Sequence, residues 1–249
     1  MTDVPAGAVP LDRRAQLAAG LARTRERIAR AAEAVGRSPD AVTMIAVTKT
    51  YPASDVLLLA GLGVREMGEN RDQEAAPKAV EVAAGGADVR WHFVGQLQRN
   101  KARSVVGYAD LVHSVDSVRL AGALAGAATR ERDRPLSVLV QLSVDGDADR
   151  GGALAGSADA DRGLDQVAAA IAGQDALRLA GLMAVAPLGW EPERAFARLA
   201  EVAQRLRVDH PGARLLSAGM SGDLEAAIAY GATHVRVGSA LLGMRSTLR

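Results

Sequence analysis

Eight short apolar runs, the first seven each followed by a stretch with helical spacing, constrain the fold more than any other feature. A strand followed by a helix, repeated along the chain, is the pattern of βα units around a parallel sheet. Eight units favour a closed (β/α)8 barrel over an open doubly wound sheet, because no G-x-G-x-x-G motif lies between a strand and a helix. The predicted strands are Thr43–Val47, Arg65–Met67, Trp91–Val94, Leu111–Ser114, Ser137–Leu142, Leu179–Met183, Arg214–Ser217 and His234–Val237.

An amphipathic helix is predicted ahead of the first strand. Leu17, Leu21 and Ile28 repeat at helical spacing in a segment that begins near Leu11, and Gly36 is typical of a helix stop. The 249 residues are the usual length of one α/β barrel. We therefore expect a single domain over residues 1–249, with residues 1–10 flexible.

The charge pattern argues against nucleic acid and membranes as partners. The 30 basic residues nearly balance the 29 acidic ones, and no block of like charge is present. No apolar run approaches the roughly 18 residues of a membrane span, and the first ten residues do not resemble a signal peptide. We expect a soluble, cytoplasmic protein, and a monomer.

A metal site is not expected either. The chain has no cysteine, and its four histidines are far apart in sequence. Asp145, Asp147 and Asp149 alternate like the start of a calcium loop, but the sixth position is Arg150 instead of glycine. His92, between two aromatic residues, is expected to be a hydrogen-bonded core histidine.

Only three of the 30 basic residues are lysine, and the other 27 are arginine. A lysine amine can attack a carbonyl, whereas a guanidinium cannot. Lys49 directly follows the first predicted strand, where barrels place their active residues. It is either a reactive amine or a solvated strand-end lysine. We expect Lys78 on the surface and Lys101 at a solvated helix start near the rim.

The segments after the last two strands predict a phosphate site. Ser221 is expected to be a helix N-cap with exposed amides beside it, and Gly238 and Ser239 follow the eighth strand. A simple helix cap is the alternative for Ser221. Phosphates often bind after strands 7 and 8 of a barrel, which favours the phosphate site.

Arg236 is predicted to point into the barrel, because Val235 and Val237 on either side of it face the helices. Its partner is either a protein carboxylate or the ring nitrogen of a ligand. In a closed barrel strand 8 adjoins strand 1, so Lys49 lies near the phosphate site. Pyridoxal phosphate combines a phosphate, a pyridine nitrogen and an aldehyde that lysine can capture.

Ordered motifs spread over the chain lead to the same cofactor. They are Thr48-Lys49-Thr50, Gly68-Glu69-Asn70, Trp91-His92-Phe93-Val94-Gly95, His113-Ser114-Val115-Asp116, Gly181-Leu182-Met183, Gly219-Met220-Ser221 and Val235-Arg236-Val237-Gly238-Ser239. With these motifs the chain resembles the pyridoxal phosphate homeostasis proteins, single-barrel relatives of the alanine racemase N-terminal domain.

The resemblance implies a fold-type III barrel that holds pyridoxal phosphate as a Schiff base on Lys49, with the ring nitrogen facing Arg236. It further implies phosphate contacts from Met220, Ser221, Gly238 and Ser239, and a pocket that includes Asn70, Met183 and Ser217. In the loop after strand 5 the chain departs from the family, with Ser143, Asp147 and Arg150 where an Asn, a Glu and a Lys are usual.

The expected role is homeostasis or delivery of the cofactor, with apo enzymes as recipients and no catalytic residue. Racemisation needs a second proton donor opposite the lysine, and none of Tyr51, Tyr108 and Tyr230 is clearly placed there. The separate β-domain of alanine racemases also finds no counterpart after strand 8. A weak amino-acid racemase remains the alternative. A Schiff-base aldolase is less favoured, because its lysine would lie deeper and strand 6 ends in Met183.

Overall fold

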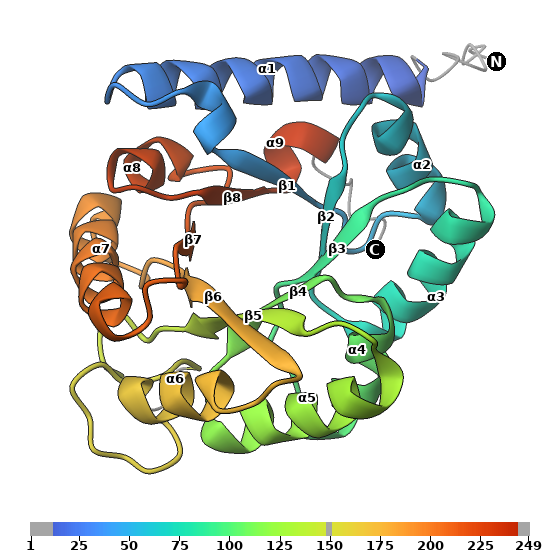
Figure 1. Ribbon diagram of the computed structural model, residues 1–249. Helices are drawn as coiled ribbons and strands as arrows, with labels where there is room; N and C mark the ends of the chain where they lie inside the picture. The colour runs from blue at the N-terminus through green and yellow to red at the C-terminus, as the bar shows by residue number, and fades with distance from the viewer. Residues whose placement is uncertain (1–11, 148–150, 244–249) are drawn as a thin grey trace, which may run out of the picture.

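The computed structural model describes residues 12–147 and 151–243 and has a closed barrel of eight parallel strands at its centre (Figure 1). Each strand pairs with its neighbours in chain order, and β8 pairs with β1 to close the barrel. The predicted (β/α)8 barrel is therefore confirmed. The strands are β1 Thr43–Val47, β2 Glu66–Glu69, β3 Arg90–Phe93, β4 Leu111–Val115, β5 Leu136–Gln141, β6 Leu177–Met183, β7 Leu215–Ser217 and β8 His234–Val237.

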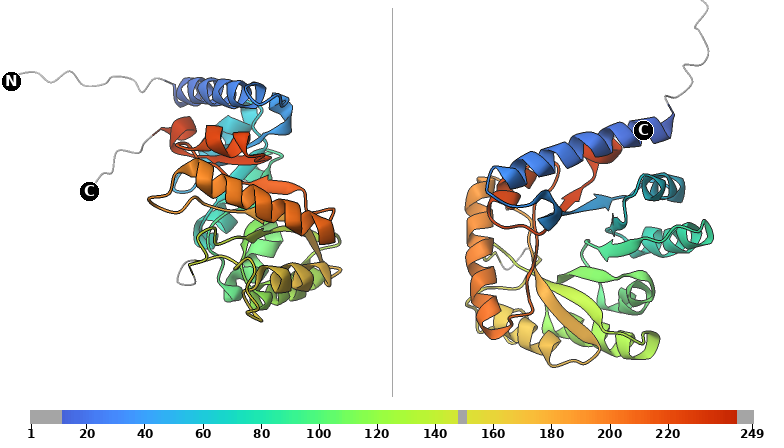
Figure 2. Two further views of the ribbon diagram at one scale, coloured as in Figure 1. Left: turned by 90° about the vertical axis from the view of Figure 1, so that its left-hand side faces the viewer. Right: turned by 45° about the horizontal axis from the view of Figure 1, so that its top comes forward.

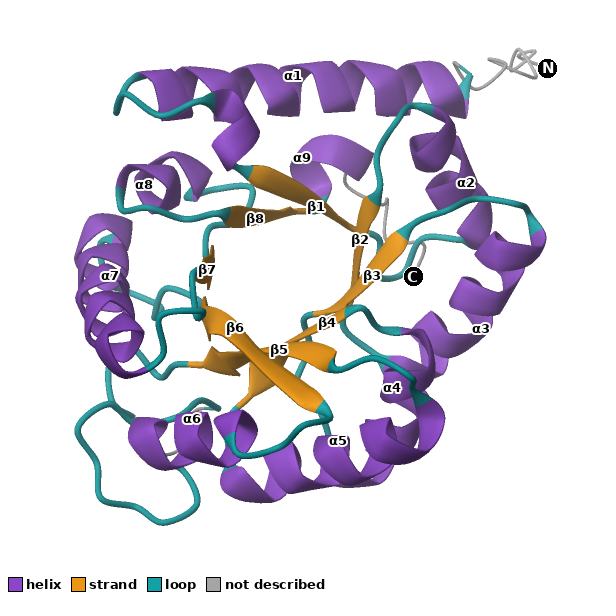
Figure 3. Ribbon diagram, viewed as in Figure 1, coloured by secondary structure: helices purple, strands orange, loops and turns teal. Residues whose placement is uncertain are grey.

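Helices surround the barrel, and one helix follows each of the first seven strands (Figure 3). Short 3-10 turns at Pro39–Ala41 and Arg99–Lys101 precede β1 and α4. The helices are α1 Arg13–Glu33, α2 Ala53–Gly61, α3 Asp72–Ala84, α4 Ala102–Tyr108, α5 Val118–Glu131, α6 Leu164–Ala172, α7 Pro192–Asp209, α8 Leu224–Ala229 and α9 Ser239–Leu242.

The leading helix is present as predicted. Helix α1 lies along the outside of the barrel next to α8 and α9 (Figure 2). The side chain of Asp12 accepts a hydrogen bond from the amide of Arg14, which caps the first turn. At Gly20 a Cβ atom would lie 2.3 Å from the carbonyl oxygen of Leu241, so glycine allows α1 to pack directly on α9. The helix covers the seam between β8 and β1.

The main core lies between the strands and the helices. Phe93, Phe196 and Val138 belong to one large buried cluster, and Leu17 and Val235 to a second cluster beneath α1. A smaller cluster occupies the barrel interior, and it consists of Leu111, Leu139, Ala180 and Met183, with Leu215 packed against it. These residues alternate along their strands with residues that face the helices.

The remaining predictions about organisation have mixed outcomes. No helix among residues 12–147 and 151–243 is long and apolar enough to cross a membrane. The segment expected to be flexible, residues 1–10, lies outside the described residues, as do Asp149 and Arg150 of the segment that resembles the start of a calcium loop. The predicted strands β1 and β8 match their observed limits, and the others differ by at most two residues at either end.

Candidate functional site

Lys49 lies at the C-terminal mouth of the barrel, which we define as the rim formed by the segments that follow the strands. It comes two residues after β1, is exposed, and has no hydrogen bond or ion pair with any described residue. Thr50 beside it has φ of 67°, a left-handed conformation that is rare outside glycine. The rim position predicted for Lys49 is therefore confirmed, and its amine is uncommitted.

The loops after β7 and β8 meet beside β1, as the phosphate prediction requires. The amide of Ala240 donates to the hydroxyl of Ser221 at 3.4 Å, which joins the two loops. A Cβ on Gly238 would lie 3.5 Å from the carbonyl oxygen of Val47, two residues before Lys49. Ser221, Ser239 and Lys49 therefore share one side of the C-terminal mouth.

The amides of this loop pair differ in availability. The amide of Met220 donates to Oδ1 of Asp223 at 2.6 Å, so a carboxylate oxygen already occupies one donor of the loop. The amides of Ser221, Gly222 and Ser239 donate to no residue within the described part of the chain. Free amides in adjoining loops are what a phosphate cradle requires.

The prediction that Ser221 is a helix N-cap is wrong. Helix α8 begins at Leu224, and its N-cap is Asp223, whose side chain makes no capping bond. Gly219 holds the loop in place instead, because it has φ of 87° and a Cβ there would lie 2.6 Å from the Cβ of Ala227. The loop therefore packs tightly on α8, and the hydroxyl of Ser221 is left to contact the start of α9.

Arg236 points into the barrel as predicted, and no carboxylate of the described residues forms an ion pair with it. Its Nη1 donates to the carbonyl oxygen of Ser217 at 2.8 Å and to the hydroxyl of Ser217 at 2.7 Å. Its Nη2 donates to the carbonyl oxygen of Ala184 at 2.8 Å. Burial lowers the pKa of Arg236 to about 10, although Asp223 opposes this. The guanidinium is held by Ser217 of β7 and by Ala184, the residue after β6. Its Nε donates a hydrogen bond to none of the described residues.

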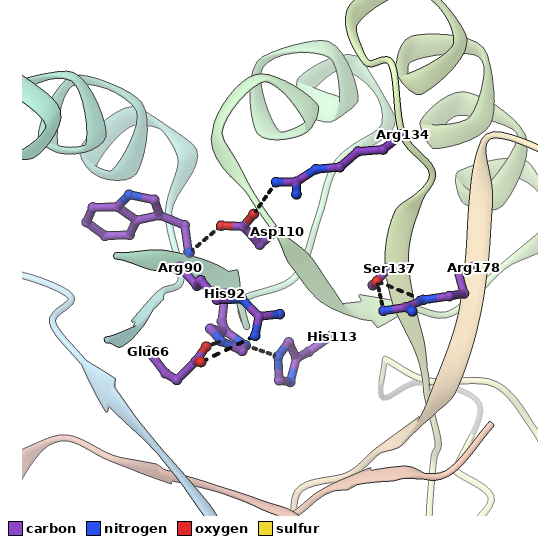
Figure 4. Close-up of polar contacts among 9 residues, drawn as sticks. Glu66, Arg90, His92, Asp110, His113, Arg134, Ser137 and Arg178 are labelled. Atoms are coloured by element: carbon purple, nitrogen blue, oxygen red, sulfur yellow. Dashed lines mark hydrogen bonds and ion pairs between the residues drawn. The ribbon is translucent and has the colours of Figure 1, made fainter. Parts of the chain in front are cut away.

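A line of hydrogen bonds runs from Arg236 through the barrel interior to Glu66 at the start of β2. Figure 4 shows its last part, from His113 through His92 to Glu66. The hydroxyl of Ser217 lies 2.9 Å from Nδ1 of His113, and Nε2 of His113 lies 2.9 Å from Nδ1 of His92. Nε2 of His92 lies 2.5 Å from Oε2 of Glu66. We name this set of five residues the lumen relay.

One assignment of protons satisfies every bond of the lumen relay with both histidines neutral. Arg236 donates to Ser217, the hydroxyl of Ser217 donates to His113, His113 donates to His92, and His92 donates to Glu66. A neutral His113 fits its surroundings, because burial above all, and also the charge of Arg236, lower the pKa of His113 well below 6.5. The pKa of Glu66 is also lowered, since the hydrogen bond from His92 and the charge of Arg90 outweigh its burial. All donors therefore point from the cation toward the carboxylate.

A buried ion pair supports the strand that carries Lys49. Nζ of Lys78, on α3, donates to Oε1 of Glu69 at 2.6 Å and to the carbonyl oxygen of Thr48 at 2.9 Å. The hydroxyl of Thr48 donates to the same carboxylate at 2.7 Å. The expectation that Lys78 is a surface residue is wrong, because its side chain is only 8% exposed. The pair anchors the residue that precedes Lys49.

Two further predicted pocket residues border the C-terminal mouth. Asn70 follows β2, and a Cβ on Gly95 would lie 2.0 Å from the carbonyl oxygen of Asn70, so the segments after β2 and β3 touch here. Met183 ends β6 and belongs to the interior cluster. Ser217 is buried, and its hydroxyl serves the lumen relay, a role that the sequence did not predict.

The three tyrosines lie in different places. The hydroxyl of Tyr51 donates to the carbonyl oxygen of Gly243 at 2.6 Å. Tyr108 is the last residue of α4, and burial raises its pKa. Tyr230 is exposed after α8. None of the three tyrosines is part of the lumen relay.

Neither the cavity beside Thr50 nor a cluster of metal ligands in the described residues supports an alternative site at the C-terminal mouth. A cavity of about 540 Å³ beside Thr50 has its other walls on α2 and α3, not on the loops after β7 and β8, so we do not assign it to the site. Within residues 12–147 and 151–243, no three acidic or histidine side chains are grouped so that they could hold a metal ion.

Two sets of contacts hold the site in place, and neither was predicted from the sequence. The lumen relay joins residues from β2, β3, β4, β7 and β8, and no local pattern connects strands so far apart in sequence. For Lys78 a signal was present, because Ala75, Lys78 and Val82 have the three- and four-residue spacing of a buried helix face.

Comparisons with known proteins agree with this geometry. Residues 20–246 match the family model described as alanine racemase, N-terminal domain. A pyridoxal phosphate homeostasis protein from Mycobacterium leprae is 43% identical, covering 93% of this chain and 94% of the relative. The protein of that name from Escherichia coli K12 is 38% identical, covering 92% of this chain and 97% of the relative.

A solved structure has the same fold. PipY of Synechococcus elongatus, with PLP bound, is 33% identical, with a TM-score of 0.74 over 91% of this chain and 100% of PipY. Residues 20–246, which match the family model, include all eight strands, the loops after β7 and β8, and the lysine after β1. The chain therefore belongs to the family of pyridoxal phosphate homeostasis proteins, built on the alanine racemase-like barrel.

Proposed function

We propose that this protein binds pyridoxal phosphate at the C-terminal mouth of its barrel and serves to hold and deliver the cofactor. The observation that carries the proposal is the placement of an uncommitted lysine, Lys49, on the same side of the rim as the joined loops of Ser221 and Ser239. Membership of the family and the PLP bound in PipY support it.

The donor set fits the cofactor group by group. The phosphate would be held by the free amides of Ser221 and Ser239, and Met220 and Gly238 would lie beside it. The ring nitrogen would face Arg236, whose Nε is unused and whose position is fixed by Ser217. A guanidinium only donates hydrogen bonds and would leave that nitrogen unprotonated, which makes a weak electron sink. Asn70 and Met183 would line the pocket.

Lys49 would hold the cofactor covalently. The bound cofactor supplies an aldehyde, and the amine of Lys49 condenses with it to a Schiff base with loss of one water molecule. The reaction is reversible, so the same residue both retains and releases the cofactor.

We propose holding and delivery as the function, without robust turnover. Racemisation needs a second proton donor opposite the lysine. The hydroxyl of Tyr51 is bonded to Gly243, Tyr108 belongs to the helix layer, and Tyr230 is exposed. The expected recipients are apo enzymes that use the cofactor, and the expected state is a monomer.

Borohydride reduction of the protein after incubation with pyridoxal phosphate tests the site. Peptide mapping is expected to place a pyridoxyl group on Lys49, and Lys49→Arg is expected to abolish the adduct. Lys101→Arg is the matched control, since Lys101 also lies near the C-terminal mouth, 4.0 Å from Asp72. An adduct that persists in Lys49→Arg would refute the assignment.

Two further measurements separate the carrier from a weak racemase. Deuterium uptake at the α-carbon of L-amino acids is expected to stay at the level of Lys49→Arg. Reactivation of an apo enzyme by the loaded protein is expected to exceed that by an equal amount of the Lys49→Arg protein. Steady deuterium uptake that depends on Lys49 would favour the racemase.

A further inference from the structure

The N-terminal end of the barrel has a cavity lined by charged residues, and most of them are arginines. We define the N-terminal mouth as the cavity of about 800 Å³ at the N-terminal ends of β3 to β6. Four arginines and two aspartates line it, and Ser137 completes its polar wall. The cavity walls therefore carry an excess of two positive charges. The lining charged residues are Arg90, Arg132, Arg134, Arg178, Asp88 and Asp110.

The lining arginines converge from three connections of the barrel. Arg90 is the first residue of β3, and Arg178 is the second residue of β6. Arg134 comes from the segment between α5 and β5. Figure 4 shows Arg90, Arg134 and Arg178 around the same opening, with Asp110 and Ser137 between them. The cations that face this space thus come from separate segments that the closed barrel brings together.

Two of the lining arginines form ion pairs, and each pair uses only part of the guanidinium. Asp110 accepts the amide of Trp91 at 2.9 Å with one oxygen and Arg134 at 3.3 Å with the other. Arg90 reaches Oε1 of Glu66 only at 3.5 Å. Each of these two arginines therefore keeps several guanidinium N–H groups that bond to none of the residues that the structure describes.

The other two arginines have no ion pair with any described carboxylate. Nε and Nη2 of Arg178 donate to the hydroxyl of Ser137 at 3.2 and 2.8 Å. Nη1 of Arg132 donates to the carbonyl oxygens of Val106 and Ala109, and its buried Nε has no hydrogen-bond partner in the described part of the chain. Both guanidinium groups are held by neutral oxygens, so their positive charges remain uncompensated.

We propose that the N-terminal mouth is a binding site for a small multivalent oxyanion, held by Arg90, Arg134 and Arg178. Guanidinium forks match phosphate and carboxylate oxygens in pairs, and arginine stays charged at every physiological pH. A cavity of about 800 Å³ exceeds what one phosphate needs, and its cations lie on different sides, so the ligand carries at least two anionic groups. The site is separate from the C-terminal mouth and does not depend on the proposed function.

Calorimetric titration of the full chain with pyrophosphate at low ionic strength tests the site. We expect saturable binding of one anion per chain, weakened at least tenfold in the double variant Arg134→Gln/Arg178→Gln. Arg205→Gln, on the exposed face of α7, is the control and is expected to bind like the wild type. An anion held by the loops after β7 and β8 would be unaffected by these substitutions, so the variants locate the binding. Unchanged affinity in the double variant, or no saturable binding, would overturn the proposal.

Two additional measurements refine the result. A parallel titration with citrate distinguishes a phosphate ligand from a carboxylate ligand, according to which anion binds more tightly. Pyrophosphate is also expected to slow the modification of Arg134 and Arg178 by phenylglyoxal, mapped by mass spectrometry, but not that of Arg205. Equal protection of all three arginines would contradict a localised site.

Discussion

The two mouths of the barrel use different cations and hold them in different ways. At the C-terminal mouth Lys49 is uncommitted, and the strand that carries it rests on the buried pair of Lys78 and Glu69. At the N-terminal mouth the cations are arginines, and their ion pairs lie at the surface, as in the pair of Arg134 and Asp110. The C-terminal mouth is thus supported by a buried ion pair, whereas the ion pairs of the N-terminal mouth are exposed.

The difference follows from what each side chain can do. All three lysines of the chain lie toward the C-terminal mouth, where an amine can be deprotonated and react. The cations that line the N-terminal mouth are arginines, which bind anions but do not form Schiff bases. The comparison predicts that covalent chemistry belongs to one end and reversible ionic binding to the other.

The largest effect on stability is expected at the ion pair under Lys49. Lys78→Met leaves the carboxylate of Glu69 buried and unpaired, and the loss of one partner of a buried pair costs about 3 to 5 kcal/mol. Urea denaturation measures this loss. Adding Glu69→Gln removes the unpaired charge and is expected to recover at least half of it. A loss below about 1 kcal/mol in Lys78→Met would show that the C-terminal mouth is not anchored in this way.

The second largest effect on stability is expected from acid, which protonates a buried histidine in the N-terminal half of the barrel interior. Burial is the main cause that lowers the pKa of His234 from 6.5 to about 4. The unfolded chain therefore binds this proton more readily, so stability is complete above pH 6.5 and is lost as the pH falls toward 4. His234 alone contributes about 3 kcal/mol to this loss.

The acid effect is measured by urea denaturation at pH 7 and at pH 4.5. His234→Gln is expected to show a smaller difference between the two pH values than the wild type. His210→Gln, at the end of α7 and outside the lumen, is the control and should behave like the wild type. An unchanged difference in His234→Gln would contradict a buried neutral histidine there.

A smaller effect is expected from the serine that holds Arg236. Ser217→Ala removes the hydroxyl shared by Arg236 and His113, although the carbonyl of residue 217 still accepts from Arg236. Under the proposed function, we expect pyridoxal phosphate to dissociate about tenfold faster, a change of about 1.4 kcal/mol, with a shifted absorption maximum. Stopped-flow absorbance measures both. Ser114→Ala is a matched control, because the buried hydroxyl of Ser114 has no hydrogen-bond partner among residues 12–147 and 151–243. Equal behaviour of the two variants would leave Ser217 without a positioning role.

The smallest effect is expected from Arg134→Gln. The pair of Arg134 and Asp110 is a surface pair, with the arginine side chain 77% exposed, and such pairs contribute less than about 1 kcal/mol. Thermal unfolding with and without pyrophosphate measures both consequences, since the variant should keep its stability and lose much of the stabilisation by the anion. A large loss of stability in Arg134→Gln without pyrophosphate would mean that ion pairs stabilise both mouths to a similar extent.

The sequence predicted the barrel well because its signals are local. The limits of β1 and β8 came directly from the runs of apolar residues, and the inward direction of Arg236 came from strand alternation. The position of Lys49 on the rim followed from its place after β1. These features depend on the order of residues within one strand and on the direction shared by parallel strands.

The predictions that were wrong or incomplete concern contacts that reach beyond a single strand or helix. Ser221 was expected to cap α8, but a glycine-dependent packing of the loop moved the helix start to Leu224. The partners of Arg236 come from β7 and from the residue after β6, and Ser217 is bound in turn by His113, 104 residues away. Composition and periodicity carry no information on such pairs, because they form only when the barrel closes.

The lumen relay has a consequence for how the molecule responds as a whole. When each proton of the relay has one acceptor, the tautomer of one imidazole fixes the tautomer of the other. If His92 presented a donor to His113, His113 would have to exchange its tautomer and turn a donor toward Ser217, whose hydroxyl would have to rotate away. A change in hydrogen bonding at Glu66, on the floor of the barrel, is thereby transmitted as a reversal of polarity to the residue that orients the guanidinium at its top.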